Sequence, residues 1–180
     1  MKTSFAELRN QNITKKLPAD ELRQRIANFF KTQNVLVLCT SQGDVPRATP
    51  LEYYSEGTTV YILGGQGTKI DNIKANSRVS IGIYSTPYTD WTDWYKVIGV
   101  QLTGSAKLLY EGDPGYSDAF KVYKWQMYAK ARGWDLSNHP KGGIIIKVEA
   151  HKIEYRELAL MAEGYSATQV WETTDGLVKT

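Results

Sequence analysis

The most constraining feature of the sequence is a series of strand-like segments joined by connections too short to hold a helix. Residues 34–40, 45–54 and 58–63 are rich in Val, Leu, Ile, Thr and Tyr. The links between them, residues 41–44 and 55–57, consist of Ser, Gln, Gly, Asp and Glu, which are typical of turns. Short links reverse the chain between neighbouring strands, so the sequence predicts an antiparallel meander.

The rest of the chain continues this pattern, with strands and helices distinguished by their hydrophobic period. Apolar alternation and apolar runs predict strands over 78–85, 97–110 and 142–155, and a shorter strand over 165–171. Helical spacing predicts helices over 18–32, 68–76 and 114–132, with a short amphipathic helix over 4–10. Strands of this length would expose their edges unless the sheet closes or pairs with another copy. We therefore expect an α+β fold in which about six antiparallel strands form a small β-barrel with flanking helices.

Composition narrows the class of protein further. The chain has 180 residues, of which 42% are hydrophobic and 23% charged, which is typical of one folded domain spanning residues 1–180. The net charge of +3 is too small to indicate a dedicated nucleic-acid-binding protein. No apolar run approaches the length of a membrane span, and the first residues lack the apolar stretch of a secretory signal. We therefore expect a cytoplasmic protein without nucleic-acid or membrane partners.

The residue types present argue against a metal site and against catalysis by a cysteine or histidine. Cys39 is the single cysteine, so neither an intramolecular disulfide nor a cysteine-rich zinc site can form. Neither of the two histidines has the spacing of a metal ligand, and no acidic pair stands out as a general acid and base. We expect no metal site, and the sequence assigns no catalytic residue.

The exit from the third strand is the first segment with a candidate function. It reads Gly64-Gly65-Gln66-Gly67-Thr68-Lys69 and leads into the helix expected over 68–76. The first turn of a helix offers unpaired N–H groups and a positive dipole, to which Thr68 adds a hydroxyl and Lys69 an ammonium group, so the segment suits a phosphate. It matches neither the P-loop nor the Rossmann fingerprint. Taken alone, an ordinary strand-to-helix turn with a threonine cap is the commoner interpretation.

The second candidate segment is Pro46-Arg47-Ala48-Thr49-Pro50-Leu51 in the second strand. Pro50 cannot donate a ladder hydrogen bond, so the strand is expected to lie at an edge or to carry a bulge. Free backbone groups there would suit a planar heterocycle, and Arg47 supplies a forked donor beside it. A proline that protects an edge strand from aggregation explains the same residues equally well.

The helix expected over 114–132 carries an aromatic set at helical spacing, which comprises Tyr116, Phe120, Tyr123, Trp125, Met127 and Tyr128. Such a set is more often core or dimer contact than a cofactor-binding surface. We therefore expect these side chains to pack rather than to bind a ligand.

Together the two candidate segments match an order of residues found in a known family. Arg47 is followed by Pro50-Leu51, a hairpin, an apolar third strand, the glycine-rich exit and Thr68-Lys69. Residues 73–80 (IKANSRVS) and 99–106 (GVQLTGSA) continue the match, which is densest over residues 34–104. This order resembles the pyridoxamine 5'-phosphate oxidase-like family of FMN-binding split β-barrels. The resemblance implies a split barrel and a homodimer that binds FMN in clefts between the subunits.

The resemblance also implies which residues contact the cofactor. Lys69 looks like the family's phosphate-binding lysine, and Thr68 stands where Arg or Ser is frequent. The segment from Arg47 through Ala48, Thr49 and Pro50 to Leu51 would line the flavin, and Ile62 and Leu63 would touch it from the third strand. A glutamine that family members place against the flavin aligns best with Gly99, while Gln101 lies two residues further on the same strand face.

Two departures from the family limit the function that the resemblance implies. The family's oxidases have a basic residue where this chain has Glu52, and their C-terminal tryptophan-to-arginine signature is absent from residues 163–180. We therefore interpret the chain as an FMN-binding protein and oxidoreductase that acts on an unidentified small-molecule substrate rather than on pyridoxine phosphate. The alternatives are a non-enzymatic flavin carrier for electron transfer, a split barrel that binds deazaflavin F420 or haem, and a dimeric barrel without a cofactor.

Overall fold

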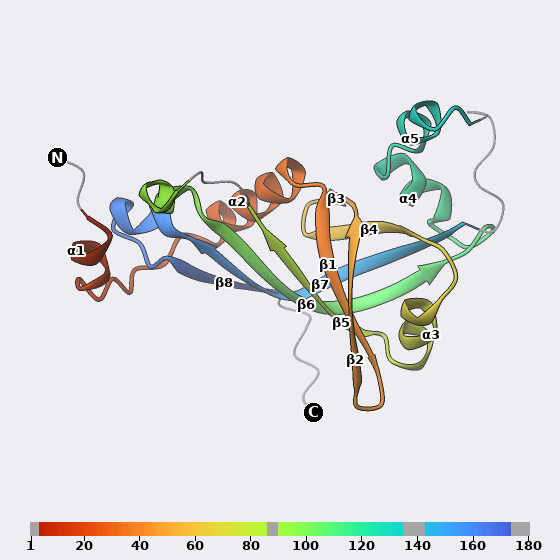
Figure 1. Ribbon diagram of the computed structural model, residues 1–180, viewed down its shortest axis with the longest axis horizontal. Helices are drawn as coiled ribbons and strands as arrows, with labels where there is room; N and C mark the ends of the chain where they lie inside the picture. Colours follow the sequence, from red (N-terminus) through yellow and green to blue (C-terminus); the bar gives the residue numbers. More distant parts are fainter. Residues whose placement is uncertain (1–3, 86–89, 135–142, 174–180) are drawn as a thin grey trace.

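An antiparallel sheet forms the centre of the molecule (Figure 1). The computed structural model describes residues 4–85, 90–134 and 143–173, and in them the sheet has eight strands in the order β2-β1-β5-β6-β7-β4-β3, with β8 paired to β7. The strands are β1 (Val35–Gln42), β2 (Val45–Glu52), β3 (Tyr54–Glu56), β4 (Thr59–Gly64), β5 (Arg78–Tyr84), β6 (Ile98–Leu109), β7 (Ile144–Glu157) and β8 (Thr168–Glu172). The sheet curls into a half-barrel, which confirms the α+β split-barrel fold expected from the sequence.

Helices flank this sheet and cover part of it (Figure 1). The α-helices are α1 (Phe5–Arg9), α2 (Ala19–Thr32), α3 (Thr68–Ala75), α4 (Tyr116–Val122) and α5 (Trp125–Ala131), and η1 (Trp91–Lys96) and η2 (Leu158–Glu163) are 3-10 helices. Helix α2 lies across the sheet, whereas α4 and α5 stand at one end of it (Figure 1). No helix in the described ranges is long and apolar enough to cross a membrane.

The sheet has an inner face, which carries the main core, and an outer face. Leu36, Leu38 and Thr40 of β1 are buried, whereas Val35 and Val37 are exposed. Residues of α2 such as Ile26 and Phe30 join the buried side in one cluster with β1, β4, β5, β6 and β7. Because side chains alternate along a strand, the burial pattern assigns every strand residue to one face or the other.

The strand expected over 45–54 is divided, because the chain turns a corner at Tyr53. The Tyr53 side chain is 2% exposed, and its hydroxyl donates to the carbonyl of Phe30 at 3.0 Å. Its backbone N–H donates to the carbonyl of Asn34, which extends the register of β1 and β2 by one pair, and from Tyr54 the chain pairs with β4 instead. Burial of the Tyr53 side chain against α2 thus separates β2 from β3 and raises the number of strands above that expected.

The single helix expected over 114–132 is wrong, because the chain breaks between α4 and α5. Lys124 adopts a left-handed backbone conformation with φ of +54°, which costs a non-glycine residue about 1 kcal/mol. The buried side chains on both sides of the break, Phe120 and Trp125, pack edge-to-face with ring centroids 5.7 Å apart. Packing of both short helices into one cluster therefore outweighs the local cost at Lys124.

Candidate functional site

The half-barrel is open between β2 and β4. Strand β2 pairs with β1 alone, and β4 pairs with β3 only up to Tyr61, so residues 62–64 pair with β7 alone. The two strands lie in contact without forming a ladder in the described part of the chain. Each therefore presents unpaired backbone N–H and C=O groups to the other, and such groups need partners. We refer to this opening as the β2–β4 gap.

Helix α3 begins directly after β4, beside this gap. Gly67 at its start has φ of +132°, a conformation that favours glycine. Asn72 anchors the helix, because its side-chain amide donates to the hydroxyl of Thr40 on β1 at 3.0 Å and both residues are buried. Lys69 lies one turn before Asn72 on the same helix face. Thr40 is the register partner of Arg47, so Arg47 and Lys69 lie on the same side of the sheet.

The charges at this end of the gap suit an anion. Arg47 is exposed and Lys69 half-buried, and neither forms an ion pair with any residue that the structure describes. The first-turn N–H groups of α3 at Thr68 and Lys69 have no acceptor within the helix. A side chain added at Gly65 or Gly67 would meet no atom within 4 Å, so the backbone here is open to a ligand. Two cations, free N–H groups and an open backbone fit a phosphate.

The other residues predicted from the second strand divide between the two faces. Thr49 and Leu51 share the inner side with Arg47, because their register partners Leu38 and Leu36 are buried. Ala48 and Pro50 face outward. The Thr49 hydroxyl is buried and has no hydrogen-bond partner among the described residues.

The residues predicted from the third strand and the helix start border the gap. The Ile62 side chain is fully buried in the main core, which leaves its main chain as the group that can meet a cofactor. Leu63 is half-buried, and Thr68 is exposed. The segments that flank the gap thus carry Arg47, Thr49, Leu51, Ile62, Leu63, Thr68 and Lys69. The side chains of Ile62 and Leu63 face opposite sides of β4, since Ile62 lies in the main core and Leu63 packs beside α4 and α5.

Gln101 lies elsewhere, on the outer face of the sheet. The registers align one row of outer-face residues across neighbouring strands, namely Pro50, Val37, Gly82, Gln101 and Glu154. A cavity of about 740 Å³ covers this part of the face and is lined by Gln101 but by neither Arg47 nor Lys69. We refer to it as the outer-face cavity. Within one protomer, Gln101 and Arg47 therefore lie on opposite faces.

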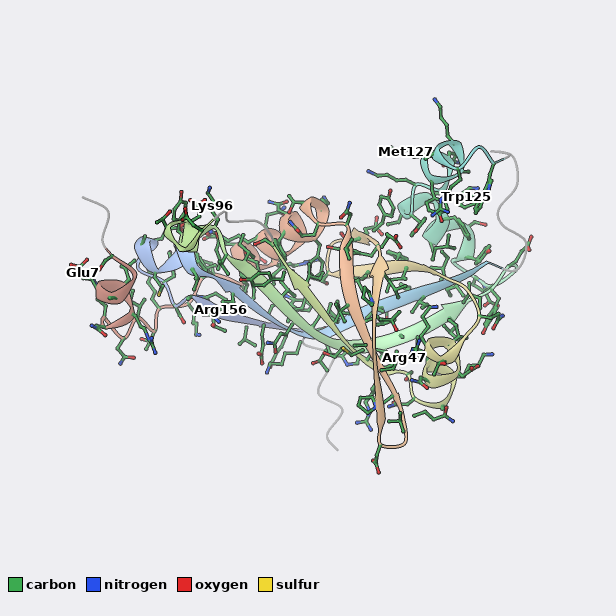
Figure 2. All side chains as sticks on the ribbon, in the orientation of Figure 1. Glu7, Arg47, Lys96, Trp125, Met127 and Arg156 are labelled. Atoms are coloured by element: carbon green, nitrogen blue, oxygen red, sulfur yellow. The ribbon has the colours of Figure 1, made fainter. Side chains whose placement is uncertain are left out.

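The outer-face cavity includes residues that sequence reasoning missed. Gly82 forms part of its floor, and an added side chain there would enter open space. Arg156 also lines it, and forms no ion pair with a described residue. In Figure 2, Arg156 lies on the sheet while Arg47 lies on the β1–β2 hairpin that projects from it. The alternation Val79, Ile81, Ile83 already indicated that Gly82 faces away from the core.

A second cavity, of about 440 Å³, lies between α2, the corner from β2 to β3, and the break between α4 and α5. Tyr54, Tyr123 and Tyr128 line it, together with Glu52 and Lys124. We refer to it as the tyrosine cavity. The aromatic set of residues 114–132 therefore does more than pack. Tyr116, Phe120 and Trp125 lie in the buried cluster of α4 and α5, Tyr128 packs against that cluster and also lines the cavity, and Tyr123 lines the cavity.

Comparisons with known proteins agree with this architecture. The family model described as pyridoxamine 5'-phosphate oxidase matches residues 22–157. No curated protein matches the chain. A putative pyridoxamine 5'-phosphate oxidase from Listeria innocua is 22% identical with a TM-score of 0.59, covering 74% of this chain and 97% of its own.

Two further solved structures share the fold. A FAD-binding protein from Mesorhizobium loti is 15% identical with a TM-score of 0.56, covering 77% of this chain and 92% of its own. A haem-binding protein from Mycobacterium smegmatis is 16% identical with a TM-score of 0.61, covering 88% of this chain and 60% of its own. Similar folds therefore accompany different bound groups.

Proposed function

The chain belongs to the pyridoxamine 5'-phosphate oxidase family, and from this premise we propose that it binds FMN in the β2–β4 gap and acts as an oxidoreductase on a small molecule. The observation that carries the proposal is that Arg47 and Lys69 lie on the same side of this gap without ion-pair partners among the described residues. The first turn of α3 adds N–H groups that suit a terminal phosphate, which FMN has and FAD lacks.

Each group at the gap has a role in this proposal. Lys69, the Thr68 hydroxyl and the first-turn N–H groups of α3 hold the phosphate. Arg47 and the main chain of β2 through Leu51 orient the ring, with Ile62 and Leu63 bordering the opposite edge. When bound, FMN supplies the hydride acceptor and donor for the reaction.

We propose a homodimer because the outer face exposes several large apolar side chains and carries Gln101. Val35, Val37, Tyr84 and Val170 all expose large apolar side chains on this face. Contiguous exposed apolar surface is typical of protein interfaces. If a second copy covers it, Gln101 of one protomer comes to the flavin held by the other, which accounts for the opposite faces of Gln101 and Arg47. The cytoplasmic location stays a prediction.

The tyrosine cavity supports an enzyme rather than a flavin carrier. It begins at Glu52, the residue after Leu51, and so adjoins the ring end of the proposed flavin site. A carrier needs no substrate cavity there. Glu52 also lines this cavity where the family's oxidases have a basic residue, so oxidation of pyridoxine phosphate is not part of the proposal.

The test is a titration of the purified protein with FMN, FAD and haem, followed by absorbance and flavin fluorescence. We expect FMN to bind most tightly, and Lys69→Ala to weaken it about tenfold or more. Lys74→Ala is the matched control, because Lys74 is exposed on the same helix, and it should change the affinity by less than about twofold. Preference for haem or FAD, or equal effects of the two variants, would overturn the proposal.

A further inference from the structure

The walls of the tyrosine cavity suit a flat ring. Tyr54 and Tyr123 meet edge-to-face with ring centroids 4.9 Å apart and planes at 67°. Tyr123 and Tyr128 do the same at 5.9 Å and 67°. Tyrosine rings that border an open volume offer faces and edges on which a third aromatic ring can stack.

Tyr123 brings to the cavity a hydroxyl that has no hydrogen-bond partner among the described residues. Its side chain is 3% exposed, yet its hydroxyl forms no hydrogen bond with any residue in the described ranges. Tyr53 is buried to the same degree, but its hydroxyl is bonded to the carbonyl of Phe30. Burial raises the pKa of Tyr123 to about 12, so the hydroxyl stays protonated and can donate. The buried oxygens without a partner in the described part of the chain are those of Thr49 and Ser55, so the Tyr123 hydroxyl is open to the cavity that Tyr123 lines, where a ligand oxygen can accept its hydrogen bond.

The charged side chains around the cavity favour a single negative charge. Lys31 and Lys124 line it, and Glu52 is the one acidic residue among the described lining residues. The Lys124 side chain reaches over Tyr54, with Nζ 5.7 Å from the centre of the ring. Two lysines and one carboxylate leave an excess of one positive charge around the cavity. This excess matches a ligand with a single negative charge better than a doubly charged phosphate.

We propose that the tyrosine cavity is the substrate site of this protein, and that its substrate is a planar aromatic monoanion such as an aromatic carboxylate. The ring lies among Tyr54, Tyr123 and Tyr128, and the carboxylate accepts from the Tyr123 hydroxyl near Lys124. The inference that this ligand is a substrate rests on the proposed flavin function. Binding of the anion itself depends only on the cavity.

The test uses benzoate, phenol and benzylamine as anionic, neutral and cationic probes, measured by calorimetry and by quenching of protein fluorescence. We expect benzoate to bind about tenfold tighter than benzylamine. Tyr123→Phe should weaken benzoate about tenfold by removing the donor, and Lys124→Gln about threefold. Lys121→Gln is the control, because Lys121 is exposed and paired with Asp118 at 2.7 Å, and it should leave binding unchanged.

The outcomes separate this inference from the flavin proposal. Benzoate binding that Tyr123→Phe and Lys124→Gln weaken supports the inference, whether or not FMN binds. Tighter binding of benzylamine, no binding of benzoate, or equal effects of Lys124→Gln and Lys121→Gln overturns it. A thermal melt of Tyr123→Phe checks its fold, and if that variant is unfolded, Lys124→Gln and Glu52→Gln decide, since Glu52→Gln should tighten benzoate. Normal FMN binding without benzoate binding refutes the cavity assignment alone.

Discussion

Asn72 on α3 donates a hydrogen bond to Thr40 on β1 across 3.0 Å, with both side chains buried. This bond holds α3, the helix that carries Lys69, against β1. Thr40 on β1 is also the register partner of Arg47 on β2. A second contact one turn later, from the Asn76 amide to the Ser41 hydroxyl at 3.3 Å, is only partly buried. The distance between the two cations of the proposed phosphate site therefore depends mainly on the buried pair.

Thr40→Val tests this dependence, because valine keeps the shape of threonine and removes the acceptor. The Asn72 amide would stay buried without a partner, which should lower the free energy of unfolding by about 1–3 kcal/mol. FMN affinity should fall as well, because α3 is less firmly held. Ser41→Ala is the control and should cost less than about 1 kcal/mol. Denaturant unfolding and FMN titration measure both quantities, and equal costs in the two variants would contradict the role given to Asn72.

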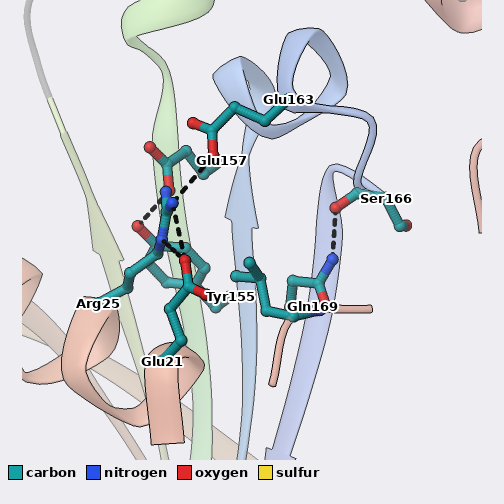
Figure 3. Close-up of polar contacts among 8 residues, drawn as sticks. Glu21, Arg25, Tyr155, Glu157, Glu163, Ser166 and Gln169 are labelled. Carbon is teal, nitrogen blue, oxygen red and sulfur yellow. Dashed lines mark hydrogen bonds and ion pairs between the residues drawn. The ribbon is translucent and has the colours of Figure 1, made fainter. Parts of the chain in front are cut away.

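Arg25 joins three elements through its guanidinium group (Figure 3). It contacts Glu21 of α2 at 3.1 Å, Glu157 at the end of β7 at 3.2 Å, and Glu163 of η2 at 3.0 Å. Glu157 also accepts a hydrogen bond from the Tyr155 hydroxyl at 2.8 Å and is the least exposed of the three carboxylates. Arg25→Met should therefore lower the free energy of unfolding by about 1–3 kcal/mol, chiefly by leaving Glu157 without its cation.

The control for Arg25 is Lys121→Met, which removes an ion pair between two largely exposed side chains. Such pairs contribute about 0–1 kcal/mol, so this variant should unfold almost as the parent does. Added salt should weaken the Lys121 pair more than the Arg25 network, which is partly buried. If both variants unfold alike in denaturant, the network does not tie α2 to the end of β7.

Because several tyrosines are buried, we expect the protein to lose stability at high pH. Burial raises the pKa of Tyr53, Tyr123 and Tyr155, and for Tyr123 it raises it to about 12. In the unfolded chain these phenols ionise near pH 10. Their contribution to stability is therefore complete below about pH 10 and is lost as the pH rises toward 12 and beyond. Denaturant unfolding between pH 9 and 12 should show the decline, and Tyr123→Phe should make it shallower; a constant unfolding midpoint over this range would refute it.

The elements near the gap could be predicted because their signals are local. Alternation along β1, the proline in β2 and the glycines before Thr68 each act within a few residues, and the structure has the strand, the edge and the helix start where they indicate. The corner at Tyr53 could not be predicted in this way. It depends on the carbonyl of Phe30, which belongs to another element and becomes its partner only once α2 packs on the sheet.

The same limit applies to the candidate site. The pattern of β6 assigns Gln101 to the side opposite Leu102, but only the closing of the sheet decides on which side of it Arg47 lies. The tyrosine cavity needs the break at Lys124, whose cause is packing of Phe120 and Trp125 rather than a helix-breaking residue. Helical spacing alone therefore predicted a continuous helix with a packing face.

The last prediction concerns the proposed dimer, and it follows from the exposure of Val37 on the outer face. Val37 is 37% exposed, lies between Pro50 and Gly82 in the register, and lines the outer-face cavity. Val37→Lys would place a charge among the apolar side chains of the proposed interface. We therefore expect the dissociation constant of the dimer to rise at least about tenfold. Met127→Lys is the control, because Met127 is 66% exposed on α5 and lies far in Figure 2 from Arg156, which lines the outer-face cavity. Sedimentation and light scattering across a range of concentrations should show a monomer for the first variant and a dimer for the second.

FMN affinity should fall when the dimer dissociates, because Gln101 and Arg47 can contact the same flavin only across two protomers. A monomeric Val37→Lys protein with full FMN affinity would therefore refute the shared site.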